Sequence, residues 1–159
     1  DLRELKRHTG LAKQLLRFLD PAATLRDLRD PAPVEKRELK LGRLDRGECD
    51  YTRGLLDGFP IFADEGKTAT VSIEVWAKDG RLQAVRATPI GESGEPIDRS
   101  ELVIFDDYRS RGGALIPTKL EIFEIRPEPQ RPAAVATIEI TKLDLEPRLE
   151  PAAFTRPKT

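Results

Sequence analysis

The chain has 159 residues, a length that is typical of one domain and that allows a core without disulfide staples. Lysine and arginine total 27 against 28 aspartate and glutamate residues, and the resulting net charge of -1 argues against nucleic-acid binding. The single cysteine, Cys49, excludes an internal disulfide and a thiolate zinc cluster, and no run approaches the ~20 apolar residues of a membrane-spanning helix.

The first predicted element is an amphipathic helix over residues 2–19. With about 100° between successive residues, Leu11 and Leu15 fall on an apolar side and the opposite side is basic. A basic amphipathic helix fits contact with a membrane surface or partner, or packing on its own sheet, and we favour the packing. A second, short helix is predicted over residues 21–29, because Asp20 suits the capping position and Pro21 the first turn.

From residue 34 onward the apolar residues recur with a period of two, which predicts antiparallel strands as far as about residue 145. The tail, residues 146–159, is proline-rich and is expected to be irregular. Short connections between successive strands indicate a meander, so the predicted fold class is α+β, with the helices grouped at the N-terminal end. The strands are expected over residues 34–44, 48–56 with 59–62 (one strand or two), 68–90 as a hairpin, 101–108, 114–125 and 133–145.

The hairpin over residues 68–90 turns at Asp79-Gly80, a dipeptide that favours a tight type I′ turn. If Lys78 pairs with Arg81, the register of the two strands follows from the turn. One face is then expected to carry Val71, Ile73, Val75, Ala77, Leu82 and Ala84, with Arg86 as its charged member.

Residues with catalytic potential are few. His8 is the only histidine and lies on the apolar side of the first predicted helix, where a hydrogen-bonded structural role is favoured. Cys49 lies between two carboxylates, which would raise the pKa of its thiol rather than lower it. Asp106 and Asp107 are neighbours on a strand and therefore point to opposite faces. No catalytic residue, metal ligand or cofactor is predicted, and we expect a protein that is not an enzyme.

Three segments resemble the C-terminal portion of the bacterial lipoprotein-carrier superfamily, the LolA/LolB-like and RseB-like half-barrels. Residues 71–87 are similar to the family's strand with a tryptophan before a tight turn. Residues 105–125 are similar to its aromatic strand, glycine turn and Pro-Thr-Lys step into the next strand. Residues 140–157 are similar to its last strand, polar turn and Phe-x-x-Pro ending.

The resemblance implies an incomplete β-barrel, a curved antiparallel sheet with the two helices on its concave face. It implies a non-enzymatic binding module of the bacterial cell envelope, periplasmic or otherwise extracytoplasmic, that accommodates an acyl chain or a lipidated protein. The alternative is a structural or regulatory protein-interaction domain whose half-barrel is permanently filled. Because methionine is absent, we expect residue 1 to be an internal boundary of a longer protein. The resemblance implies that residues 1–159 are one such domain, or the C-terminal part of one. The apolar ligand contacts are expected to be Leu11, Leu15, Val71, Ile73, Val75 and Phe105.

Overall fold

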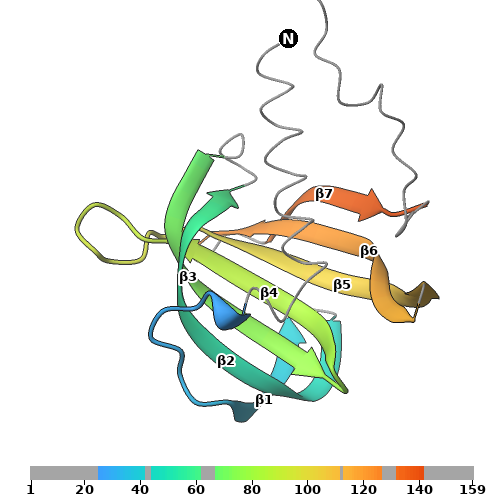
Figure 1. Cartoon of the computed structure of the whole chain (residues 1–159). Coiled ribbons are helices and arrows are strands. Elements are labelled where there is room, and N and C mark those ends of the chain that lie inside the picture. Colours follow the sequence, from blue (N-terminus) through green and yellow to red (C-terminus); the bar gives the residue numbers. More distant parts are fainter. Residues whose placement is uncertain (1–24, 42–43, 62–66, 112, 127–131, 142–159) are drawn as a thin grey trace, which may run out of the picture.

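The computed structural model describes residues 25–41, 44–61, 67–111, 113–126 and 132–141, and in these ranges the protein is all-β (Figure 1). Seven strands lie in the sheet in the same order as in the chain, and each is antiparallel to its neighbours. The predicted meander is therefore confirmed. The strands are β1 (Glu35–Leu41), β2 (Leu44–Ile61), β3 (Lys67–Lys78), β4 (Arg81–Pro89), β5 (Ser100–Arg111), β6 (Ala114–Ile125) and β7 (Ala133–Glu139).

The predicted α+β class is wrong for the part of the chain that the structure describes. The helix expected over residues 2–19 lies outside the described residues, as do residues 21–24 of the second one. Arg29, at the expected end of that second helix, instead forms an isolated antiparallel bridge with Leu55 of β2, with N···O distances of 2.8 and 2.9 Å. Farther along, Ala32 N donates to Arg53 O of β2 at 2.8 Å, and Pro33 favours extended backbone in Ala32, the residue before it. The described part of the expected helix keeps one turn at its start, with Leu28 N donating to Leu25 O at 3.5 Å, and from Arg29 onward the backbone pairs with β2.

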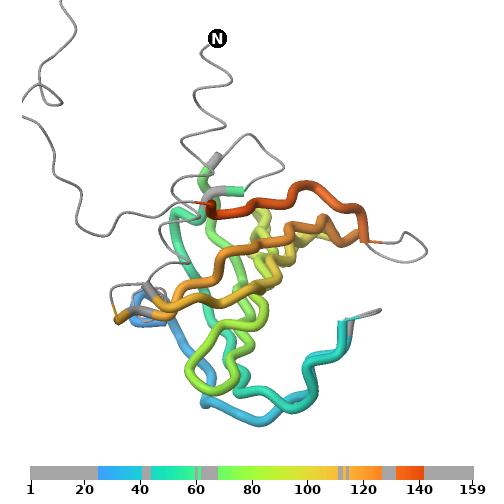
Figure 2. The backbone as a smooth tube through the Cα atoms, turned by 90° about the vertical axis from the view of Figure 1, so that its right-hand side faces the viewer, coloured from blue at the N-terminus to red at the C-terminus, as the bar shows by residue number. Residues whose placement is uncertain are grey.

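β2 is the longest strand, with 18 residues, and it is one strand where the sequence left one or two open. Two of its glycines adopt positive φ angles, 67° at Gly47 and 64° at Gly58. Both lie at irregularities in pairing, Gly47 opposite β1 and Gly58 between Leu56 and Phe59 opposite β3. Bulges of this kind bend a strand and increase its twist. The sheet is consequently rolled into a trough, with β1 and the start of β2 at one edge and β7 at the other (Figure 2).

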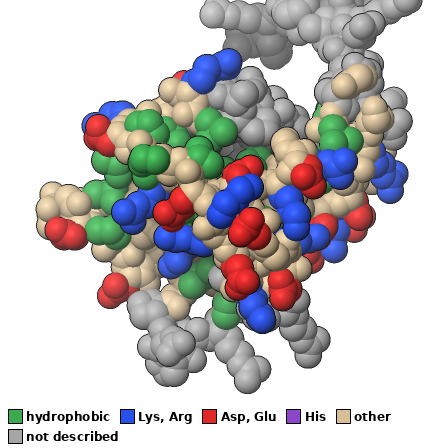
Figure 3. Space-filling model, turned by 90° about the horizontal axis from the view of Figure 1, so that it is seen from below, with side chains coloured by type: hydrophobic (Ala, Val, Ile, Leu, Met, Phe, Trp, Pro, Cys, Tyr) green, Lys and Arg blue, Asp and Glu red, His purple; other side chains and the backbone are tan. Residues whose placement is uncertain are grey.

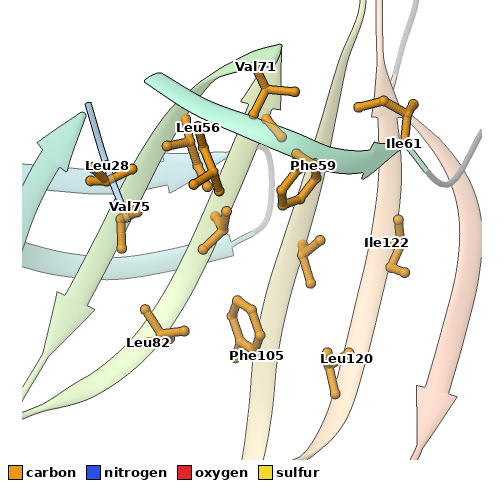
Figure 4. Close-up of a cluster of buried hydrophobic side chains, with 14 residues drawn as sticks. Leu28, Leu56, Phe59, Ile61, Val71, Val75, Leu82, Phe105, Leu120 and Ile122 are labelled. Carbon is orange, nitrogen blue, oxygen red and sulfur yellow. The ribbon is translucent and has the colours of Figure 1, made fainter. Parts of the chain in front are cut away.

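The C-terminal end of β2 folds over one face of the sheet. Phe59 and Ile61 lie over the sheet there, with Ile61 above Ile122 of β6 (Figure 4). We call this buried cluster the main core, because it draws side chains from β2 to β6. Its members are Leu28, Leu56, Phe59, Ile61, Val71, Ile73, Val75, Leu82, Val85, Ala87, Val103, Phe105, Leu120 and Ile122.

The opposite face is covered at the other end of β2, together with β1. There the Arg46 guanidinium donates to the Asp106 carboxylate of β5 at 2.7 Å, and the Arg46 carbonyl accepts from Lys78 Nζ at 2.9 Å. These contacts hold the β1–β2 hairpin across β3 and β4. The cluster beneath it, the second core, consists of Leu39, Cys49, Tyr51, Trp76, Ala84, Leu102 and Ile104.

The tight turn between β3 and β4 is confirmed. Lys78 pairs with Arg81, and the two turn residues have φ angles of 52° at Asp79 and 71° at Gly80, as a type I′ turn requires. The predicted register holds for the next pair and then changes. Ala77 pairs with Leu82, but Trp76 pairs with Ala84, so Gln83 is an extra residue in β4.

This bulge decides which side chains of β4 are buried. The prediction that Arg86 shares the apolar face with Ile73 is wrong, as is the placing of Ala84 there. Arg86 pairs with Glu74 on the opposite face, whereas Val85 enters the main core beside Val75. The physical reason is the two-residue period of a strand: one extra residue turns every following side chain to the other face.

Candidate functional site

The predicted ligand contacts divide between described and undescribed residues. Leu11 and Leu15 lie outside the described residues. The other four belong to the main core, where the exposed fractions are 0% for Val71, 0% for Ile73, 3% for Val75 and 1% for Phe105. Side chains with so little exposure are surrounded by protein atoms and border no space that a water molecule would enter. Val71, Ile73 and Val75 share a buried face as predicted, and these side chains are packed in one cluster with Phe105.

A row of polar contacts crosses the opposite face and was not predicted. It takes one residue from each of five neighbouring strands, β1 to β5. The Arg37 guanidinium lies 3.9 Å from the centre of the Tyr51 ring, and the Tyr51 hydroxyl donates to the Glu74 carboxylate at 2.7 Å. Glu74 also lies 3.7 Å from Arg86 Nη1, and Arg86 Nε donates to Ser100 Oγ at 2.9 Å. We call these five residues the polar row.

A pocket of about 340 Å³ opens beside the polar row, and we call it the recess. Its floor comes from β3, β4, β5 and the end of β6, and its wall is the loop between β4 and β5, which projects from the sheet in Figure 1. Backbone hydrogen bonds fix the loop, among them those from Ile97 N to Pro89 O at 3.0 Å and from Gly91 N to Glu95 O at 2.8 Å. The lining residues are Ser72, Glu74, Arg86, Thr88, Pro96, Ile97, Asp98, Arg99, Ser100, Ile125 and Arg126.

The recess was missed because its key pair depends on the bulge at Gln83. In a regular hairpin Arg86 would lie opposite Ile73, and no acidic partner would be expected for it. The sequence did contain a usable signal, because Glu74 and Arg86 are the only charged residues away from the ends of β3 and β4. Opposite charges placed directly across two strands stabilise their pairing, so a Glu–Arg match was a possible guide to the register.

A smaller pocket, of about 190 Å³, lies at the opposite end of β5, and none of the four described ligand contacts lines either pocket. Asp107 lines this pocket and is exposed, whereas its neighbour Asp106 is half-buried against Arg46. The two carboxylates therefore do not form one site. Cys49 is buried in the second core, and burial raises the pKa of its thiol, which leaves it a poor nucleophile.

The pKa values of two tyrosines lie above the ordinary range for this side chain. Burial raises the pKa of Tyr51 to about 12, and the hydrogen bond to Glu74 acts in the same direction. Burial also raises the pKa of Tyr108 to about 12, and its hydroxyl donates to the carbonyl of Leu82 at 2.7 Å. An unfolded tyrosine releases its proton near pH 10. Between pH of about 10 and about 12 the folded chain therefore keeps protons that the unfolded chain loses.

The free energy of unfolding is accordingly expected to fall as the pH rises from 10 towards 12, since the unfolded state then binds fewer protons. Urea unfolding at a series of pH values measures this slope. The double variant Tyr51→Phe and Tyr108→Phe should lose less stability over the same window. An identical slope in both proteins would show that neither phenol titrates abnormally.

The surface seen in Figure 3 carries acidic and basic side chains interspersed, without a large area of one sign. Over the described ranges, no helix is long and apolar enough to cross a membrane, and no three or more His, Cys, Asp or Glu side chains are grouped to hold a metal ion. No protein-family model, curated protein or solved structure matches the chain.

Proposed function

We propose that this chain is a non-enzymatic protein-interaction domain of the cell envelope, built on a half-barrel whose apolar interior is filled by its own side chains. The observation that carries the proposal is the near-zero exposure of Val71, Ile73, Val75 and Phe105, the described residues expected to receive an acyl chain. An acyl chain placed there would have to displace packed side chains. Opening such a core costs several kcal/mol, because cavities and shifted rotamers are both unfavourable.

The placement in the lipoprotein-carrier superfamily rests on the resemblance, and the strand arrangement supports it. Two of the resembling segments correspond to the β3–β4 and β5–β6 hairpins of one antiparallel meander. Among the described strands β1 pairs only with β2, and β7 only with β6, which suits an incomplete barrel. The extracytoplasmic location is proposed on the resemblance alone.

A fluorescent fatty acid such as cis-parinaric acid tests whether the interior accepts an acyl chain. We expect no saturable binding by the intact chain up to the solubility limit of the probe. Native mass spectrometry of the gently purified protein should likewise show no mass increment of an acyl lipid. The packing of the main core is the reason for both expectations.

Two tryptophan variants sharpen the test. Ile73→Trp places a bulky ring in the main core, whereas Leu115→Trp is a matched control at a residue that is 45% exposed. Saturable probe binding that Ile73→Trp abolishes and Leu115→Trp leaves unchanged would replace the proposal with acyl-chain carriage. The thermal unfolding midpoint of Ile73→Trp must be measured alongside, so that lost binding is not confused with lost folding.

A further inference from the structure

We propose that the recess binds a carboxylate that has an apolar group next to it, as found in an N-acylated amino acid or at the C-terminus of a peptide. The inference does not depend on the proposed function, because the recess lies on the face of the sheet opposite to the main core. It rests on the guanidinium, the hydroxyls and the apolar patch that line the recess.

The guanidinium of Arg86 is held in a fixed position at the floor of the recess. Its Nε donates to Ser100 Oγ at 2.9 Å, and its Nη1 lies 3.7 Å from the Glu74 carboxylate, which Tyr51 also engages. The remaining nitrogen, Nη2, has no partner among the described residues, and the Arg86 side chain is 41% exposed. A guanidinium whose orientation is already fixed offers planar donors to a carboxylate at little further cost in side-chain entropy.

Hydroxyl groups lie beside this guanidinium. Ser72 and Thr88 pair directly across β3 and β4, so both side chains are on the recess face, next to the pair formed by Glu74 and Arg86. Each hydroxyl can donate one hydrogen bond to an anion. A carboxylate with four acceptor positions can therefore receive donors from the arginine and from the strand floor together.

The acidic side chains of the lining disfavour a dianion. Glu74 and Asp98 line the recess beside the arginines, and the Arg126 guanidinium is already bound to the Glu124 carboxylate at 3.0 and 3.3 Å. A carboxylate carries one negative charge at neutral pH. A phosphate monoester carries close to two at neutral pH and would meet repulsion from Glu74 and Asp98.

The rim of the recess supplies an apolar surface. Pro96, Ile97 and Ile125 line it, and Ile97 is among the few large hydrophobic side chains of the described chain that are exposed, at 37%. The volume of about 340 Å³ is near the lower end of the ~300–1,000 Å³ range of small-molecule sites. It suits one acylated amino acid or one terminal peptide residue.

The test is a titration with hippurate (N-benzoylglycine), followed by backbone amide NMR and by calorimetry. Hippurate should produce saturable shifts at Ser72, Thr88 and Ser100, whereas the uncharged hippuramide and inorganic phosphate should bind at least about tenfold more weakly. Arg86→Gln should weaken hippurate binding by about tenfold or more. Arg109→Gln, an arginine that lines the smaller pocket at the other end of β5, is the matched control and should have no effect.

Several outcomes would overturn the proposal. These are equal binding of hippuramide, shifts confined to the smaller pocket, or loss of binding in Arg109→Gln rather than in Arg86→Gln. The shift map of the unmodified protein decides the matter even if Arg86→Gln fails to fold. A short peptide ending in Gly-Phe, compared with its C-terminal amide, separates the two sources: tighter binding than hippurate indicates a peptide terminus, and weaker binding a free acylated amino acid.

Discussion

Replacing Phe105 by alanine is expected to lower the free energy of unfolding by about 3–5 kcal/mol. Phe105 is 1% exposed, is among the largest fully buried side chains, and lies on β5 between Leu82 of β4 and Leu120 of β6 (Figure 4). Truncation removes the transfer free energy of the ring and leaves a cavity that the neighbouring β-branched residues cannot readily fill. Urea unfolding monitored by circular dichroism measures the change.

The matched control is Leu115→Ala on β6, because this side chain is 45% exposed. Its cost should stay within about 0.5 kcal/mol. A loss below about 1 kcal/mol for Phe105→Ala would mean that the main core relaxes easily or contains space. That result would reopen the question of acyl-chain binding in the interior.

The variant Val85→Asp is expected to cost about 4 kcal/mol or more, which approaches the total stability of an ordinary domain. Val85 is 1% exposed in the main core, and a carboxylate placed there would lack both water and a counter-ion. The bulge at Gln83 is what places residue 85 in the main core, where the side chain must be apolar. Without it, Val85 would be on the other face, the face of Glu74 and Trp76.

Gln83→Asp is the control for this prediction, since Gln83 is the partly exposed extra residue of the bulge. Its cost should be small, within about 1 kcal/mol. Thermal unfolding of both variants distinguishes the two registers. If Val85→Asp folds with a nearly unchanged midpoint, the bulge is not where the structure places it.

The strands of this protein could be predicted from local sequence patterns. Asp79-Gly80 sets a turn that requires positive φ at two residues, and few other dipeptides satisfy that requirement. The alternation of Val71, Ile73 and Val75 with polar residues fixed the buried face of β3, and all three are buried. Short turns between successive strands implied the antiparallel meander, which is the observed order.

The candidate sites could be predicted less well from the sequence. The four described contacts predicted for an acyl chain do lie together, and they are packed in the main core. The recess was not predicted, because its lining comes from four strands, β3 to β6, and from a loop. In addition, Arg86 lies on the recess face only because the bulge shifts the register of β4. A bulge adds one residue without a reliable local signature, so the periodicity of β4 pointed Arg86 inward.

The sequence by itself determined the turns, the strand order and the apolar face of β3, because these follow from φ preferences, loop length and side-chain alternation over a few residues. Only the tertiary structure decided that the two ends of β2 cover opposite faces, that Arg29 pairs with Leu55 instead of ending a helix, and that Arg86 meets Glu74 and Ser100. Each of these depends on contacts between residues far apart in the chain. The free energies of burial and of cross-strand pairing select such contacts. Both are larger than the weak conformational preferences of a short segment of sequence.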